Sequence, residues 1–154
     1  MIPTAATSIA KRVIVIDDNE ILLRAWKRIL SHMGCVCFIT TNPEAAVEEI
    51  ERTGADLLIC DIVMPRMDGF EVIQRMNQLV RKPKVVLTTG YVCDFKRLKL
   101  DVTEDIHVLL KPYDSLQEIR RFVQRLLDGD ETLDEEETST THTLDATRVH
   151  LWSL

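Results

Sequence analysis

Short apolar runs and amphipathic stretches alternate along residues 11–127 of the chain. Five of the apolar runs have strand length and are rich in β-branched and aliphatic residues, which is typical of strands covered on both faces in a parallel sheet. These predicted strands are RVIVI at 12–16, CVCFIT at 35–40, DLLIC at 56–60, KVVLTT at 84–89 and IHVLL at 106–110.

Apolar residues at helical spacing separate the strands. The first predicted helix covers about residues 19–33 and is closed by Gly34. Its apolar stripe consists of Leu22, Trp26, Ile29 and Met33. Further helices are predicted at about 42–53 behind the Asn42–Pro43 start signal, through Val72–Leu79, and at about 114–127. Residues 91–105 are less regular, and Asp94 is a candidate cap for a short helix there.

Five β-then-α units predict an α/β domain with a doubly wound, five-stranded parallel sheet. We expect residues 1–10 to form an N-terminal extension, 11–127 the domain, and 128–154 an acidic, Ser/Thr-rich tail. The tail is too polar to fold by itself. Its last residues, RVHLWSL, either belong to a disordered end or dock on a surface or partner.

Charge is concentrated in that tail. Residues 128–154 hold 8 of the 25 acidic residues and 1 of the 19 basic ones, so the domain is nearly neutral. It has no concentrated basic face for a nucleic acid backbone. No apolar run approaches the roughly 20 residues of a membrane span, and the N-terminus does not resemble a secretory signal. The four cysteines form no metal or disulfide pattern. We therefore expect a cytoplasmic protein.

Polar residues follow four of the predicted strands. In a doubly wound sheet, ligands bind beyond the carboxyl ends of the strands, where the strand order reverses. The residues at these ends are Asp17-Asp18, Asp61, Thr88-Thr89-Gly90 and Lys111-Pro112. Each has a simpler explanation when taken singly, since an aspartate can cap a helix and a lysine can be a solvated surface residue. Their joint placement favours one site instead.

Three aspartates repel one another unless a cation lies among them, and Mg²⁺ prefers oxygen ligands. A carboxylate such as Asp61 can act as a nucleophile toward phosphorus. The metal and Lys111 would then neutralise charge on the phosphoryl oxygens, and Thr89 could hydrogen-bond the bound group. These residues predict a magnesium-dependent phosphoryl site.

The segments VIVIDDNE, DLLICDIVMPRMDG, VVLTTGY and LLKPYD resemble the receiver domain of two-component response regulators, over roughly residues 11–127. The resemblance implies the flavodoxin-like receiver fold and a phosphoacceptor switch rather than an enzyme. It implies that Asp61 accepts a phosphoryl group from a histidine kinase or histidine phosphotransfer protein. It also implies that Asp17, Asp18, Asp61 and the backbone carbonyl of Val63 hold Mg²⁺.

The resemblance further implies that Lys111 contacts the phosphoryl group, that the Lys111–Pro112 peptide is cis, and that a threonine of the strand at 84–89 moves toward the site. Thr89 is favoured over Thr88, because the small Gly90 follows it. The family often has an aromatic switch residue three positions before the lysine, where this chain has Val108. The surface that reports phosphorylation would be built from residues 91–105, 106–110 and 114–127. Its expected partner is a downstream protein, and a homodimer could form through the same surface.

Twenty-seven residues follow Leu127, which is too few for a DNA-binding or enzymatic output domain. We therefore expect a stand-alone receiver that acts by protein–protein contact or as a phosphorelay intermediate. The alternative is that the sequence is a fragment of a longer protein. Two other functions, a phosphohydrolase and a binding module, fit the sequence less well than a receiver. A phosphohydrolase would carry an acid two residues after Asp61, where this chain has Val63. A binding module that has lost phosphorylation would not need the complete set of Asp17, Asp18, Asp61 and Lys111.

Overall fold

The structure is a computed structural model of the chain. It describes residues 8–90, 106–113 and 115–129, together with the backbone of 139–144 and 147–153. The predicted short helix at Asp94 and the rest of 91–105 lie outside the described residues.

Five parallel strands form the centre of the molecule, in the order β2-β1-β3-β4-β5. The strands are β1 (Arg12–Ile16), β2 (Val36–Thr40), β3 (Leu57–Asp61), β4 (Lys84–Thr89) and β5 (Ile106–Leu110). This confirms the doubly wound α/β fold, and the observed strand bounds differ from the predicted ones by a single residue at most. The strand order reverses at β1, which is adjacent to both β2 and β3.

Each helix begins at a side chain that caps its free backbone N–H groups. The helices are α1 (Glu20–His32), α2 (Pro43–Thr53), α3 (Gly69–Met76) and α4 (Leu116–Asp128), with Asn19, Asn42, Asp68 and Ser115 as their N-caps. These caps satisfy donors that a helix start leaves unpaired. Helix α3 ends three residues before the predicted Leu79, which follows in a turn.

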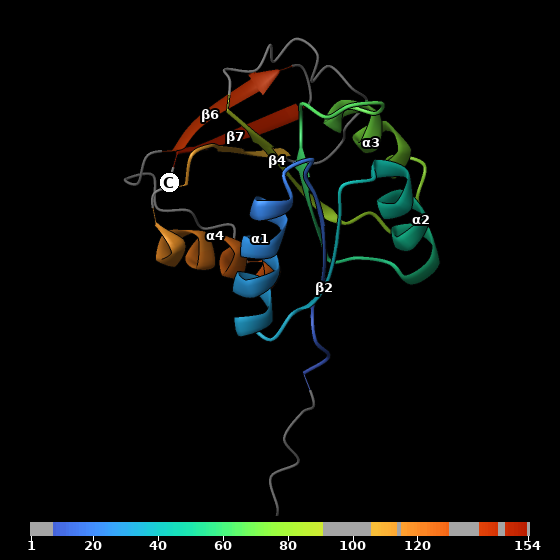
Figure 1. Cartoon of the computed structure of the whole chain (residues 1–154). Coiled ribbons are helices and arrows are strands. Elements are labelled where there is room, and N and C mark those ends of the chain that lie inside the picture. Colours follow the sequence, from blue (N-terminus) through green and yellow to red (C-terminus); the bar gives the residue numbers. More distant parts are fainter. Residues whose placement is uncertain (1–7, 91–105, 114, 130–138, 145–146, 154) are drawn as a thin grey trace, which may run out of the picture.

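The helices cover the two faces of the sheet, with α1 and α4 on one face and α2 and α3 on the other (Figure 1). Alternating strand residues supply the two cores, because successive side chains of a strand point to opposite faces. In β1, Val13 and Val15 pack with α1 and α4, whereas Ile14 and Ile16 pack with α2 and α3. This double coverage explains why the strands are continuously apolar.

The tail contributes two further strands that the sequence analysis did not predict. Strand β7 (Thr147–Ser153) pairs in parallel with β5, and β6 (Ser139–Leu144) pairs antiparallel with β7. Ser139–Leu144 is mostly polar, and for the more apolar RVHLWSL the sequence alone did not decide between a disordered end and docking, so the pairing with β5 was not predicted. Among the described residues, no helix has the length and apolar character needed to cross a bilayer.

Candidate functional site

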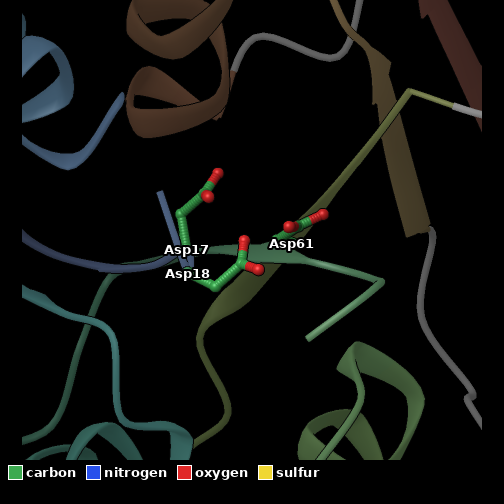
Figure 2. A group of neighbouring side chains, drawn as sticks. All are labelled: Asp17, Asp18 and Asp61. Atoms are coloured by element: carbon green, nitrogen blue, oxygen red, sulfur yellow. The ribbon is translucent and has the colours of Figure 1, made fainter. Parts of the chain in front are cut away.

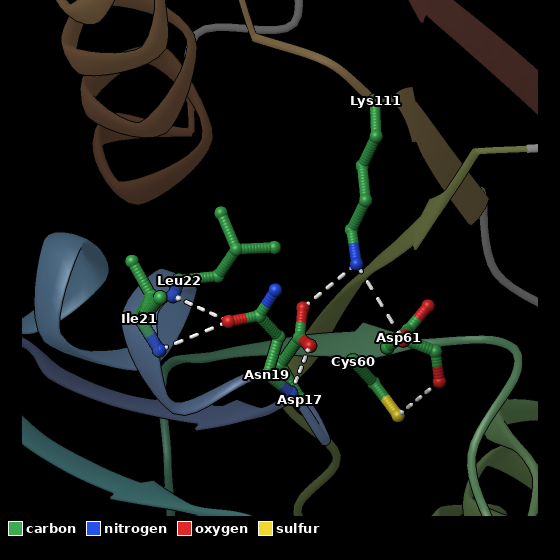
Figure 3. A network of polar contacts seen from close by, with 7 residues as sticks. All are labelled: Asp17, Asn19, Ile21, Leu22, Cys60, Asp61 and Lys111. Atoms are coloured by element: carbon green, nitrogen blue, oxygen red, sulfur yellow. Dashed lines mark hydrogen bonds and ion pairs between the residues drawn. The ribbon is translucent and has the colours of Figure 1, made fainter.

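Asp17 stands directly after β1 and is buried, with 1% of its surface exposed. One carboxylate oxygen, Oδ1, accepts a hydrogen bond from the backbone N–H of Asn19 at 2.8 Å. The other, Oδ2, accepts from Lys111 Nζ at 2.8 Å (Figure 3). A carboxylate at this depth needs such partners, because burying an unpaired charge is strongly unfavourable.

Asp61 is the last residue of β3, which lies next to β1 in the sheet. Its side chain lies beside those of Asp17 and Asp18 (Figure 2), and one carboxylate oxygen of each of the three lies within 4.8 Å of the others. Asp61 is 5% exposed, whereas Asp18 is open to solvent. The site is therefore closed at its base and open on the side of Asp18.

Lys111 reaches this cluster from the end of β5. Its Nζ lies 2.8 Å from Asp17 Oδ2 and 3.5 Å from Asp61 Oδ2, so the closer ion pair is with Asp17. The backbone N–H of Lys111 donates to the Thr89 carbonyl at 2.8 Å, and this bond holds the Lys111 backbone in place at the end of β4. The Lys111–Pro112 peptide is cis, as the resemblance implied.

The charges at the site do not balance. Burial is the largest influence on Asp61 and raises its pKa; the Lys111 ammonium opposes this, and the carboxylates of Asp17 and Asp18 add to it. The result is a pKa of about 6, well above the ordinary 3.8. One ammonium does not offset three carboxylates, so the cluster has the donor set and the excess negative charge that suit a hard divalent cation.

The loop between β3 and α3 holds the end of β3 in place. The N–H of Gly69 donates to the Ile62 carbonyl at 2.9 Å, and a Cβ at Gly69 would lie only 2.8 Å from the Asp61 carbonyl oxygen. Asp68 and Glu71 cap α3 reciprocally. Gly69 belongs to the DLLICDIVMPRMDG segment, and the structure shows that its lack of a side chain allows this close approach.

The other predicted residues lie around the same end of the sheet. Val63 follows Asp61 by two residues and its side chain is 59% exposed. Thr88 and Thr89 are both buried, on opposite faces of β4. Thr88 is the register partner of Asp61, and Thr89 lies one residue nearer the strand end. Val108 is fully buried in the core beneath α2 and α3.

The comparisons with known proteins agree with this site. The family model of the response regulator receiver domain matches residues 13–139. The chain is 27% identical over 117 residues to the response regulator receiver protein CpdR of Brucella abortus, covering 76% of this chain and 97% of that protein. It is 31% identical over 121 residues to the Regulator of RpoS of Escherichia coli K12, covering 75% of this chain but 34% of that protein.

The fold also matches solved structures. A CheY-like response regulator receiver domain protein from Methanospirillum hungatei superposes with a TM-score of 0.67 at 23% identity, covering 80% of this chain and 98% of that one. The chain belongs to the response regulator receiver family. It is a receiver of two-component signalling, that is, a phosphoacceptor switch rather than a conventional enzyme.

Proposed function

We propose that Asp61 accepts a phosphoryl group from the phosphohistidine of a histidine kinase or histidine phosphotransfer protein. The observation that carries the proposal is the convergence of the Asp17, Asp18 and Asp61 carboxylates within 4.8 Å, with Lys111 Nζ between Asp17 and Asp61. An isolated surface aspartate would have neither the carboxylate neighbours nor the ammonium that phosphoryl chemistry uses.

In the proposed reaction, an Asp61 carboxylate oxygen attacks the phosphorus atom of the phosphohistidine. The new O–P bond forms as the P–N bond breaks, and the electron pair returns to the imidazole nitrogen, which is then free to bind a proton. Lys111 exchanges its ion pair with Asp17 for contact with the phosphoryl oxygens. The Thr89 hydroxyl donates a hydrogen bond to the same group.

The residues present fit a magnesium ion. The carboxylates of Asp17, Asp18 and Asp61 and the backbone carbonyl of Val63 would hold it, and the ion would neutralise charge that develops on the phosphoryl oxygens. The proposed output is a change of protein–protein contact through the surface formed by β5, α4 and residues 91–105, of which 91–105 lie outside the described residues.

The direct test is to incubate the protein with acetyl phosphate, with and without Mg²⁺, and to weigh it intact by mass spectrometry. We expect a gain of one phosphoryl group that requires Mg²⁺ and is absent in Asp61→Asn. Asp56→Asn is the matched control, because Asp56 immediately precedes β3 at the opposite end of the same strand and should leave the gain intact.

Two results would contradict the assignment. A wild-type protein that gains no mass would rule out Asp61 as an acceptor for small donors and favour either a strictly kinase-dependent receiver or a binding module that works without phosphorylation. A gain that persists in Asp61→Asn would place the acceptor elsewhere in the chain.

A further inference from the structure

Tyr113 carries an unusual hydroxyl group. Its oxygen is buried, and among the described residues it is the one buried side-chain nitrogen or oxygen without a hydrogen-bond partner. Buried hydroxyl groups are normally paired, and leaving one unpaired is unfavourable enough that each exception calls for an explanation. A lone tyrosine after Lys111-Pro112 forms no pattern in the sequence, so Tyr113 could not be recognised there as a candidate residue.

The surroundings of this hydroxyl connect it to the site. Burial, the largest influence, raises the pKa of Tyr113, and the nearby Thr88 hydroxyl partly offsets the increase. The carboxylates of Asp17 and Asp61 raise the pKa of Tyr113 further. The hydroxyl therefore lies close enough to Thr88 and Trp26 for their side chains to lower the pKa of Tyr113 as hydrogen-bonding groups, but in the resting structure it does not reach the distance and angle of a hydrogen bond with either.

The ring of Tyr113 connects the same position to the interior beneath α1. It packs edge to face on the indole of Trp26, with ring centroids 5.7 Å apart and an interplanar angle of 71°. Trp26 is 2% exposed and belongs to the core beneath α1 and α4. In β5, the position at which the family often has an aromatic residue is occupied by Val108. Val108 packs beneath α2 and α3, on the face of the sheet opposite to Trp26 and Tyr113.

We propose that Tyr113 is a positioning residue that couples the state of the acceptor site to the layer formed by α1 and α4, through Thr88 on one side and Trp26 on the other. The inference rests on the proposed phosphorylation of Asp61. It assigns the two threonines different roles: Thr89 contacts the phosphoryl group, and Thr88 pairs with Tyr113.

The coupling follows from the ion pairs of Lys111. In the resting site Lys111 Nζ lies closer to Asp17 than to Asp61. A phosphoryl group adds negative charge at Asp61 and draws the ammonium toward it. Tyr113 is two residues further along the chain and shifts with this segment, so that its hydroxyl donates to the Thr88 hydroxyl. A hydrogen bond made in one state and absent in the other biases the equilibrium between them.

Trp26 provides the readout. The chain has two tryptophans, so a Trp152→Phe background makes Trp26 the sole indole fluorophore. In this background, acetyl phosphate and Mg²⁺ should change the Trp26 emission in proportion to the phosphorylated fraction measured by intact mass. Tyr113→Phe keeps the ring and removes the hydroxyl. It should take up the phosphoryl group to the same extent but show a smaller emission change per phosphorylated molecule, because losing one hydrogen bond lowers the equilibrium constant for the coupled arrangement about fivefold.

Threonine variants separate coupling from simple packing. Thr88→Val should reduce the emission change as Tyr113→Phe does, and Thr88→Ser, which keeps the hydroxyl, should restore it. Thr53→Val is the matched control, because Thr53 ends α2 on the other face of the sheet and its hydroxyl donates to Glu49 instead. This control should keep the full emission change.

The inference is overturned if Tyr113→Phe or Thr88→Val keeps the full emission change per phosphorylated molecule. It is also overturned if the parent protein is phosphorylated while Trp26 emission stays constant, a result that leaves the proposed function intact. If the parent protein gains no phosphoryl mass from acetyl phosphate or from a phosphohistidine donor, the proposed function fails, and the inference fails with it.

Discussion

The two ends of the sheet carry the same kinds of charged side chain in opposite arrangements. At the amino ends of the strands, Glu49 pairs with two arginines and Asp56 pairs with one. The ion pairs are Arg12–Glu49 at 3.6 Å, Arg52–Glu49 at 2.6 Å and Arg81–Asp56 at 3.3 Å. At the carboxyl ends, three aspartates share Lys111. Cations outnumber acids at the first end, and acids outnumber cations at the second.

This difference separates charges that stabilise the fold from charges that are available for chemistry. The arginines at the amino end are mostly solvent-exposed, and each pair is satisfied locally, so it contributes modestly to stability. The carboxyl end keeps an excess of negative charge in a partly desolvated site, which destabilises the resting protein. Perturbed ionisable groups of this kind are typical of functional sites.

The largest expected effect comes from forcing the carboxyl end apart. Gly69→Ala should lower the free energy of unfolding by about 3 kcal/mol, because its Cβ would lie 2.8 Å from the Asp61 carbonyl and 3.0 Å from Ile62 Cα. Chemical denaturation measures this loss. Gly90→Ala is the matched control, since nothing lies within 4 Å of a Cβ there. Equal stability of the two variants would show that the β3–α3 loop adjusts without strain.

A smaller effect of opposite sign is expected for Asp61→Asn in protein kept free of divalent metal by chelation. The pKa of Asp61 is raised from 3.8 to about 6, so the folded chain binds more protons than the unfolded chain between these values. Wild-type stability attributable to this group therefore falls as the pH rises through that window. The asparagine does not titrate, and the variant should be more stable by about 2 kcal/mol above pH 6.

Denaturation curves at pH 5 and pH 8 test that prediction. The advantage of Asp61→Asn should be smaller at pH 5, where part of the wild-type Asp61 is already protonated. Asp56→Asn, at the other end of the strand, should give no comparable gain at either pH. An advantage of equal size at both pH values would contradict the assignment of the raised pKa to Asp61.

The smallest effect is expected at the amino end. Arg81→Gln removes the ion pair with Asp56, but the Arg81 side chain is 80% exposed, so the free energy of unfolding should change by less than about 0.5 kcal/mol. Phosphoryl uptake measured by intact mass should be unaltered. A destabilisation above about 1 kcal/mol would contradict the view that the ion pairs at the amino ends of the strands contribute only modestly to stability.

Much of the fold could be predicted because local patterns are strong here. The run RVIVI and the helical stripe containing Trp26 each specify their element without help from distant residues. Capping residues such as Asn42 and Gly34 also act locally, and the structure places helix boundaries at them. The tail strands β6 and β7 escaped prediction because β7 pairs with the edge of β5, which is formed elsewhere in the chain, and β6 pairs with β7 in turn.

The candidate site divides in the same way. The order of residues along the chain is enough to show which of them stand at the strand ends, and hence that Asp17, Asp61 and Lys111 would meet at one end of a parallel sheet. Three contacts could be known from the folded molecule alone: Lys111 lies closer to Asp17 than to Asp61, Gly69 packs on the Asp61 carbonyl, and the Tyr113 ring packs on Trp26. The reason is physical: periodicity and strand ends are properties of neighbouring residues. Side-chain contacts across 94 positions of sequence, as between Asp17 and Lys111, depend on how the whole core packs.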